Sequence, residues 1–356
     1  MSDLILPGAR LTSPPPPNRV PVTAVTDWEQ LQRLIDGLTP QDAIIDCASV
    51  YGLPYGVRRQ LLEQVLTSRS ILSTIVHSHL PPPTGISRVG ALAYSGRLWS
   101  RYLREGRFVP SRGLDFVWVA CTPQGVFPGV ITPSTVVRPI HSLDYDLMLT
   151  SPPPQIKRPY VLLLDAGGND QFDGASLQME RLFTEGEWEA LIALALDRWD
   201  ALGVKVLIAR HPRSVPPTHA VYTGHTVVMG GAPALLRHSA YALTLNPSSV
   251  LGIATATGTP TAFLAEGVEA LPRFVQRQVR GVRRCLGIPV IPASRLPSAE
   301  QPPRVNEHKY VQYSQRFVKV PGTSQRDFWS VVAHDLRESW RLPKVHRFGS
   351  GSRASI

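Results

Sequence analysis

The segments 160–168 (YVLLLDAGG), 204–212 (VKVLIARHP) and 241–249 (YALTLNPSS) decide the fold of the second half of this chain. Each begins as an apolar run, which is the pattern of a buried strand, and ends in small or polar residues. Apolar residues at helical spacing follow at 187–203 and 250–258. Because strands alternate with helices, we expect a parallel sheet covered by helices on both faces.

The first half of the chain repeats this alternation. Strand-like and helix-like segments follow one another from residue 28 to residue 140, and a proline cluster at 152–154 separates them from the second half. The expected strands are 43–52, 71–79, 115–121 and 134–140, and the expected helices are 28–38, 57–66 and 86–106. The sequence therefore predicts an α/β fold of two tandem Rossmann-like domains that face a cleft.

We expect the chain to divide into five parts. The amphipathic pattern of 326–340 predicts a C-terminal helix that has to dock on a domain. The parts are a flexible leader (1–20), an N-terminal Rossmann-like acceptor domain (21–155), a C-terminal Rossmann-like nucleotide-sugar domain (156–322), a helix that packs back on the N-terminal domain (323–342) and a disordered basic tail (343–356).

Composition limits the class of protein. The 356 residues are 43% hydrophobic and 18% charged, which favours folded domains over a disordered chain. No apolar run approaches the roughly 18 residues that a membrane span needs, and the N-terminus lacks the pattern of a signal peptide. Three widely spaced cysteines do not suit a disulfide framework or a zinc site. The sequence predicts a cytoplasmic protein.

The formal net charge of +10 favours a polyanionic partner. Five arginines fall between residues 273 and 284, and we interpret them as the solvated face of a helix. No nucleic-acid-binding motif is present, so we expect no nucleic-acid partner. Association with an anionic membrane surface, such as the cytoplasmic face of the inner membrane, stays open.

The polar residues that follow the expected strands are the candidates for chemistry, because ligands of open parallel sheets lie at the carboxyl ends of the strands. A carboxylate there can act as a general base or simply form a turn, and a histidine can be a general acid or a structural residue. Serines before a helix can hold a phosphate or act as its N-cap. The candidates are Asp165, Gly167, Asp170, Arg210, His211, Arg213, Gly230, Ser248 and Ser249.

The order of three short motifs carries a family resemblance. Asp-x-Gly at Asp165, His-Pro at His211 and Ser-Ser at Ser248, each after a strand, resemble the motifs of bacterial sialyltransferases and capsule-type Kdo transferases. The connector 138–149 (RPIHSLDYDLML) is similar to one in surface-polysaccharide glycosyltransferases. The resemblance implies a GT-B fold and transfer of sialic acid or Kdo from a CMP-sugar to a glycan or lipid-linked glycan, with no further cofactor.

The resemblance also implies roles for single residues. His211 would assist departure of the phosphate, Ser248 and Ser249 would bind it, and the loop around Gly230 would contact the base of the nucleotide. The second acid of the family's first motif is replaced by Ala166, so the general base is open between Asp165, Asp170 and a residue of the first domain such as Asp46.

Three other interpretations stay open or are set aside. The same fold with a UDP-hexose donor is the nearest alternative, and an inactive nucleotide-sugar-binding protein is another, because Ala166 replaces an acid. Asp144-Tyr145-Asp146 has the spacing of a metal-binding motif, but it lies in the connector rather than after a nucleotide-binding strand. We therefore expect no metal site.

Overall fold

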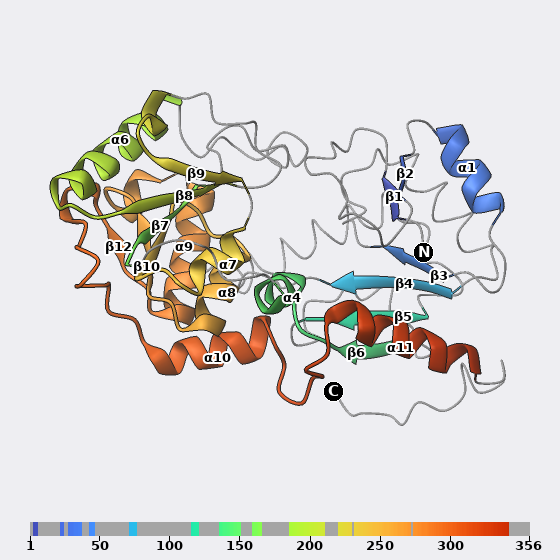
Figure 1. Ribbon diagram of the computed structural model, residues 1–356. Coiled ribbons are helices and arrows are strands. Elements are labelled where there is room, and N and C mark those ends of the chain that lie inside the picture. Colours follow the sequence, from blue (N-terminus) through green and yellow to red (C-terminus); the bar gives the residue numbers. More distant parts are fainter. Residues whose placement is uncertain are drawn as a thin grey trace.

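The structure is a computed structural model of two lobes that lie side by side (Figure 1). The N-terminal lobe contains β1 to β6, and the C-terminal lobe contains β7 to β12. The structure describes residues 3–5, 22–24, 28–37, 43–46, 71–76, 115–120, 135–150, 159–165, 185–210, 220–229, 231–271 and 273–341.

A four-stranded parallel sheet with the order β3-β4-β5-β6 forms the N-terminal lobe. Its strands are β3 (Ala43–Asp46), β4 (Ile71–Val76), β5 (Phe116–Val119) and β6 (Val136–Pro139). The same lobe holds α1 (Trp28–Asp36) and a parallel pair, β1 (Asp3–Ile5) and β2 (Val22–Ala24). β1 lies within residues 1–20, the segment expected to be a flexible leader, and pairs with β2; the leader itself stays a prediction.

A six-stranded parallel sheet with the order β12-β11-β10-β7-β8-β9 forms the C-terminal lobe. The four central strands are buried on both faces, as their apolar runs predict. The strands are β7 (Val161–Asp165), β8 (Val206–Arg210), β9 (Thr226–Met229), β10 (Tyr241–Thr244), β11 (Thr261–Leu264) and β12 (Val290–Ile291).

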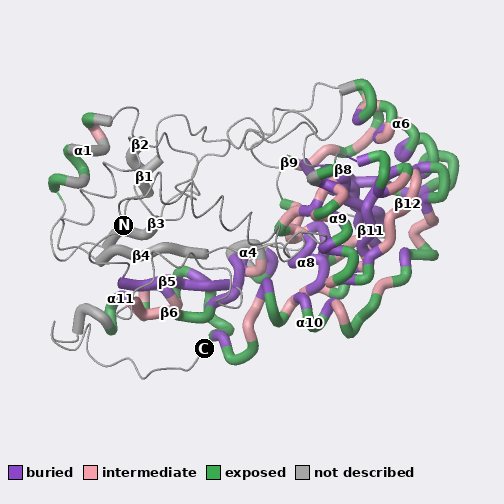
Figure 2. Tube along the Cα trace, turned by 180° about the vertical axis from the view of Figure 1, so that it is seen from behind, coloured by how far each residue is buried: buried purple, intermediate pink, exposed green. Residues whose placement is uncertain are grey.

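Helices cover both faces of this sheet. Val161 and Leu163 of β7 pack with α6 (Glu185–Ala201), whereas Leu162 and Leu164 pack with the helices of the other face. Those helices are α7 (Ala232–Leu236), α8 (Val250–Thr257), α9 (Arg273–Leu286) and α10 (Glu307–Phe317). Short 3-10 turns occur at η3 (Ala220–Tyr222), η4 (Val268–Ala270) and η5 (Ala293–Arg295). The buried strands lie between the partly exposed helices in Figure 2.

The last helix, α11 (Phe328–Arg341), returns to the N-terminal lobe. Its Phe328 and Leu336 belong to the same core cluster as Trp118 of β5. The Trp118 Nε1 also donates a hydrogen bond to the Asp335 carboxylate at 3.0 Å. The crossing helix expected from the sequence is therefore present and is fixed by apolar and polar contacts.

The α/β class with two parallel sheets is confirmed, whereas the domain boundaries stay predictions. The expected helices 57–66 and 86–106 and the expected tail 343–356 lie outside the described residues. β12 and α10 were not expected. Among the described residues, no helix has the length and apolar character needed to cross a bilayer.

Candidate active site

The order of the six strands defines where a ligand would meet the C-terminal sheet. From β7 the chain proceeds to β8 and β9 on one side, and then returns to place β10 on the other side of β7. The direction of winding therefore reverses between β7 and β10, and the crevice at such a switch point is the usual ligand site of open α/β sheets. Asp165 ends β7, and residues 245–249 lead from β10 into α8.

The carboxyl ends of β7 and β8 are joined by a buried ion pair. Asp165 and Arg210 face one another in the strand register, and Asp165 Oδ2 lies 3.7 Å from Arg210 Nε, with both side chains fully buried. The Asp165 carboxylate also accepts hydrogen bonds from the Tyr222 hydroxyl and, at 3.3 Å, from Trp188 Nε1. Arg210 lies over the Tyr222 ring, with its Cζ 5.5 Å from the ring centroid. Charge, hydrogen bonds and ring contact thus hold the two strand ends together.

This environment indicates a structural role for Asp165. A general base has to reach a proton of the substrate, but the Asp165 side chain has no exposed surface and receives hydrogen bonds from two buried donors. Arg210 is equally buried, so it positions the end of β8 rather than facing a ligand. Since His211 is the next residue after β8, the pair fixes the end of the strand that precedes His211.

The two serines lie where the sequence predicts them, at the N-terminus of α8. Ser249 occupies the N-cap position with φ −59° and ψ −25°, and its side chain makes no capping hydrogen bond. A plain N-cap accepts such a bond from the helix, so the capping interpretation does not account for this serine. Ser249 is exposed and Ser248 half-buried. Both serines therefore lie at the N-terminus of α8, where the positive end of the helix dipole favours an anion.

Asn246 is a site candidate to which the sequence analysis gave no role. It follows β10 in the turn before the serines, and its Oδ1 is buried without a hydrogen-bond partner among the described residues. Its main-chain oxygen accepts from the Thr244 hydroxyl at 2.7 Å, which orders the turn. Buried amide oxygens are nearly always paired, so this atom is available to a donor group of a ligand. The signal in the sequence was its position between β10 and the Ser-Ser pair, two residues before Ser248.

The remaining predicted site residues lie outside the described residues, and their roles stay predictions. The neighbouring residues Met229 and Gly231 are described: Met229 is 40% exposed at the end of β9, and Gly231 adopts a left-handed conformation with φ 70°. For Asp46 only the backbone is described, at the end of β3, so its proposed role as a base also stays a prediction. The residues that are not described are Gly167, Asp170, His211, Arg213 and Gly230.

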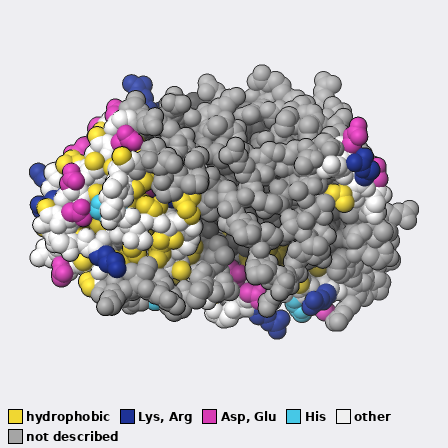
Figure 3. All heavy atoms as spheres, turned by 45° about the horizontal axis from the view of Figure 1, so that its top comes forward, with side chains coloured by type: hydrophobic (Ala, Val, Ile, Leu, Met, Phe, Trp, Pro, Cys, Tyr) yellow, Lys and Arg dark blue, Asp and Glu magenta, His cyan; other side chains and the backbone are white. Residues whose placement is uncertain are grey.

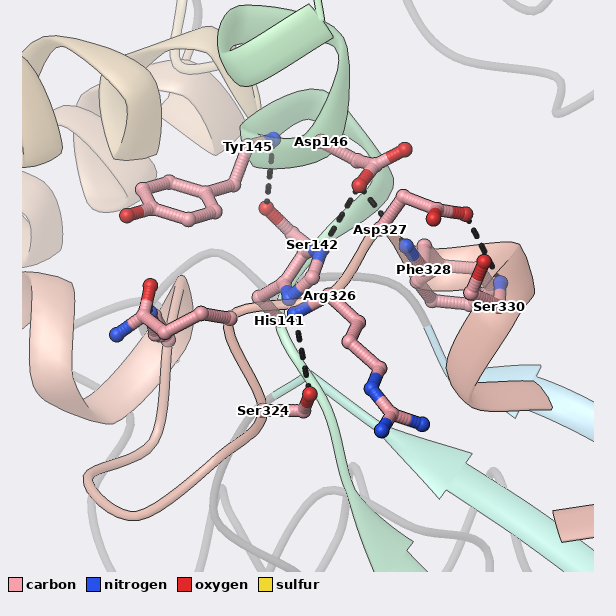
Figure 4. Close-up of polar contacts among 11 residues, drawn as sticks. His141, Ser142, Tyr145, Asp146, Ser324, Arg326, Asp327, Phe328 and Ser330 are labelled. Atoms are coloured by element: carbon pink, nitrogen blue, oxygen red, sulfur yellow. Dashed lines mark hydrogen bonds and ion pairs between the residues drawn. The ribbon is translucent and has the colours of Figure 1, made fainter. Parts of the chain in front are cut away.

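A second polar cluster joins the connector to the C-terminal helix (Figure 4). Asp146 of α4 (Leu143–Thr150) accepts a hydrogen bond from the His141 ring Nε2 at 3.0 Å and another from the Phe328 N–H at 2.9 Å. The Asp327 carboxylate accepts from the Ser330 N–H at 2.9 Å, and its hydrogen bonds with Ser330 lower the pKa of Asp327. Two carboxylates therefore satisfy the N-terminus of α11.

This cluster gives structural contacts to Tyr145 and Asp146 of the Asp144-Tyr145-Asp146 motif. The Asp146 carboxylate fixes the start of α11, and Tyr145 lies against the Lys319 ammonium, with the Nζ 5.4 Å from the ring centroid. In the part of the chain that the structure describes, no group of three or more His, Cys, Asp or Glu side chains could hold a metal ion. Tyr145 and Asp146 thus have a structural role.

This chain has only low similarity to known proteins. No family model and no curated protein matches the chain. Among solved structures, the glycosyltransferase SnogD from Streptomyces nogalater is 16% identical over 74% of this chain and 76% of its own, with a TM-score of 0.39. For the calicheamicin glycosyltransferase CalG4 the identity is 13% over 90% and 86%, with a TM-score of 0.43. For the spinosyn rhamnosyltransferase SpnG, complexed with thymidine diphosphate, it is 12% over 90% and 83%, with a TM-score of 0.36.

Identities and TM-scores this low assign neither an activity nor a donor to this chain. The arrangement of the site itself has to supply the argument for function.

Proposed function

We propose that this chain is a glycosyltransferase that binds a nucleotide-activated sugar at the carboxyl end of the C-terminal sheet. The observation that supports the proposal most is the switch point between β7 and β10, with the N-terminus of α8 beside it. Ser249 there makes no capping bond, and Asn246 offers a buried acceptor. Anion-binding and neutral hydrogen-bonding groups side by side suit the phosphate and the nucleoside of one ligand.

The donor we propose is a CMP-sugar carrying sialic acid or Kdo. This choice rests on the ordered Asp-x-Gly, His-Pro and Ser-Ser motifs. A CMP-sugar has one phosphate, which the hydroxyls of Ser248 and Ser249 and the N–H groups of α8 can hold without a metal ion. The UDP-hexose alternative keeps the same site, and its second phosphate would need further cations from outside the described residues.

In the proposed reaction, an acceptor hydroxyl attacks the anomeric carbon while the bond from that carbon to the phosphate oxygen breaks. The hydroxyl proton passes to a carboxylate, and we assign this role to Asp170, because Asp165 is buried within its own hydrogen bonds. His211 and the serines stabilise the negative charge on the departing CMP. The acceptor is a glycan or a lipid-linked glycan.

Thermal unfolding with CMP, UDP or GDP tests the donor. A nucleotide at 100 times its dissociation constant adds about 2.7 kcal/mol of apparent stability. We expect CMP alone to raise the melting temperature. A shift with UDP alone would replace the CMP-sugar by the UDP-hexose alternative, and no shift with any nucleotide would contradict the proposed site.

Replacing Ser248 and Ser249 with alanine tests the phosphate contact. Because Ser249 makes no capping bond, the double variant should unfold at the temperature of the wild type without nucleotide and lose most of the CMP shift. Ser294→Ala, an exposed serine of η5, is the matched control and should keep the shift. His211→Ala should reduce donor hydrolysis by orders of magnitude with the fold intact, and unchanged hydrolysis would refute its role.

A further inference from the structure

We propose that the exposed face of α9 binds the surface of an anionic phospholipid bilayer. This helix carries five arginines and no acidic residue. Four of them, Arg273, Arg277, Arg280 and Arg284, recur at the spacing of one helix face, and all four are exposed. At 1.5 Å per residue they form a straight stripe about 16 Å long.

The opposite face of α9 fixes the helix to the lobe. Val275, Val279, Val282 and Leu286 have the same spacing and are at most 2% exposed within the core that α8 and α10 share. No large apolar side chain of α9 is exposed among those that the structure describes. Among its described side chains, the helix therefore presents a row of charges and no exposed large apolar group, so the attraction that these side chains offer to a bilayer is electrostatic.

The described residues compensate the charges of the stripe only weakly. Glu269 lies 3.4 Å from Arg280, but both side chains are well exposed, at 81% and 49%, and such pairs are weak. Arg273, Arg277 and Arg284 have no carboxylate at ion-pair distance among the described residues. Like charges three and four residues apart repel one another and weaken a helix. A row of this kind gains stability when an external anion neutralises it.

α6, which lies on the other face of the sheet, has the opposite charge. α6 carries Glu185, Glu187, Glu189, Asp197 and Asp200 against Arg198 as its one basic residue. Since α6 and α9 pack on opposite faces of the six-stranded sheet, an anionic surface attracts the α9 face and repels the α6 face. Figure 2 views the lobe with α9 in front, and Figure 3 shows acidic side chains over the outer end of the lobe where α6 lies. This asymmetry orients the lobe.

One feature of α9 favours phospholipid over nucleic acid as the anion. All five cations of α9 are arginines, whose planar guanidinium binds the phosphate oxygens of either. Proteins that bind single-stranded nucleic acid also use aromatic side chains that stack on the bases. The exposed side chains described on α9 are all arginine. Gln276 is held by hydrogen bonds to the main-chain oxygens of Leu271 and Glu269. A uniform row of guanidinium groups matches a uniform array of phosphates, as at a membrane face.

Co-sedimentation of the full chain with vesicles tests this surface. The vesicles contain phosphatidylcholine alone or with about 30 mol% phosphatidylglycerol, at low and at high salt. Each arginine beside an anionic bilayer raises the partition coefficient about fivefold, so Arg277→Gln with Arg284→Gln should lower it about 25-fold. Arg295→Gln with Arg304→Gln removes the same charge from other exposed positions and should change it less than twofold.

Each outcome decides the inference. We expect binding to anionic vesicles alone, loss of binding at high salt, and retention of binding in Arg277→Lys with Arg284→Lys, which keeps the charge. Glutamine is a good helix former and relieves like-charge repulsion, so the folded state should persist in the double variant. Equal loss in both glutamine pairs, no loss in the α9 pair, binding to neutral vesicles, or tighter binding to DNA than to anionic vesicles would overturn it. The outcome does not depend on sugar transfer.

Discussion

Replacing Asp165 with asparagine separates the structural role of this residue from a catalytic one. In the wild type, Arg210 Nε lies 3.7 Å from Asp165 Oδ2, and both side chains are fully buried. The substitution leaves the Arg210 guanidinium facing a neutral amide instead of this carboxylate. It also weakens the hydrogen bonds from Tyr222 and Trp188. Removing one partner of a buried ion pair costs about 3–5 kcal/mol, a large part of the 5–15 kcal/mol that stabilises a typical domain.

A double-mutant cycle measures the pair directly. Arg210→Met alone should cost a similar amount, because it leaves the Asp165 carboxylate buried without its cation. The double variant, Asp165→Asn with Arg210→Met, buries neither charge, so its loss should be smaller than the sum of the single losses by about 2 kcal/mol. Equilibrium urea unfolding followed by tryptophan fluorescence gives all four free energies, since Trp188 lies within the network.

The result that would refute this reasoning is specific. If Asp165→Asn unfolded at the urea concentration of the wild type and yet abolished donor hydrolysis, Asp165 would be a catalytic carboxylate. The buried network would then contribute little to stability, and the general base would be Asp165 rather than Asp170.

Three further predictions test packing, pH dependence and capping. A Cβ on Gly252 of α8 would meet the Val318 side chain at 2.8 Å, so Gly252→Ala should cost about 1–3 kcal/mol in urea unfolding, whereas the control Gly186→Ala, with open space around it, should not destabilise. Burial raises the pKa of Tyr241 to about 12, so the folded state holds this proton more tightly and loses stability as the pH rises from 10 to 12; Tyr241→Phe should flatten that decline. Hydrogen bonds with Ser330 lower the pKa of Asp327, so its carboxylate stabilises the folded state at pH values above the ordinary pKa of aspartate, and this contribution is lost as the pH falls. At pH 7, Asp327→Ala should lower the free energy of unfolding by about 1 kcal/mol and Asp327→Asn by less.

The second sheet could be read from the sequence because each of its central strands is a continuous apolar run. The observed β7, β8 and β10 lie within the expected segments for this reason. β12 spans two residues, too short to give a pattern. α10 was missed although its signal was present: the aromatic residues Tyr310, Tyr313 and Phe317 are buried at helical spacing, and Asn306 caps its start.

The site was predictable only where its parts are adjacent in the sequence. The serines follow β10 within five residues along the chain, so the strand pattern located them. The partners of Asp165 lie 23 and 57 residues away along the chain, and no local pattern pairs a carboxylate with a distant tryptophan or tyrosine. The sequence therefore indicated that Asp165 lies at a strand end, while its burial came from tertiary contacts.

The junction between the lobes also depends on tertiary contacts between residues far apart in the sequence, and these contacts include the helix α8 of the proposed site. α8 reaches the N-terminal lobe by two routes. One runs through α4, which packs on α8 and whose Asp146 holds the start of α11, and the other runs through Val318, the residue after α10, which lies against Gly252. The chain after Val318 then pairs with the connector at His141. Both routes meet at the His141–Asp146 hydrogen bond. The helix whose N-terminus forms the proposed phosphate site is thus one packing unit with the contacts that join the two lobes.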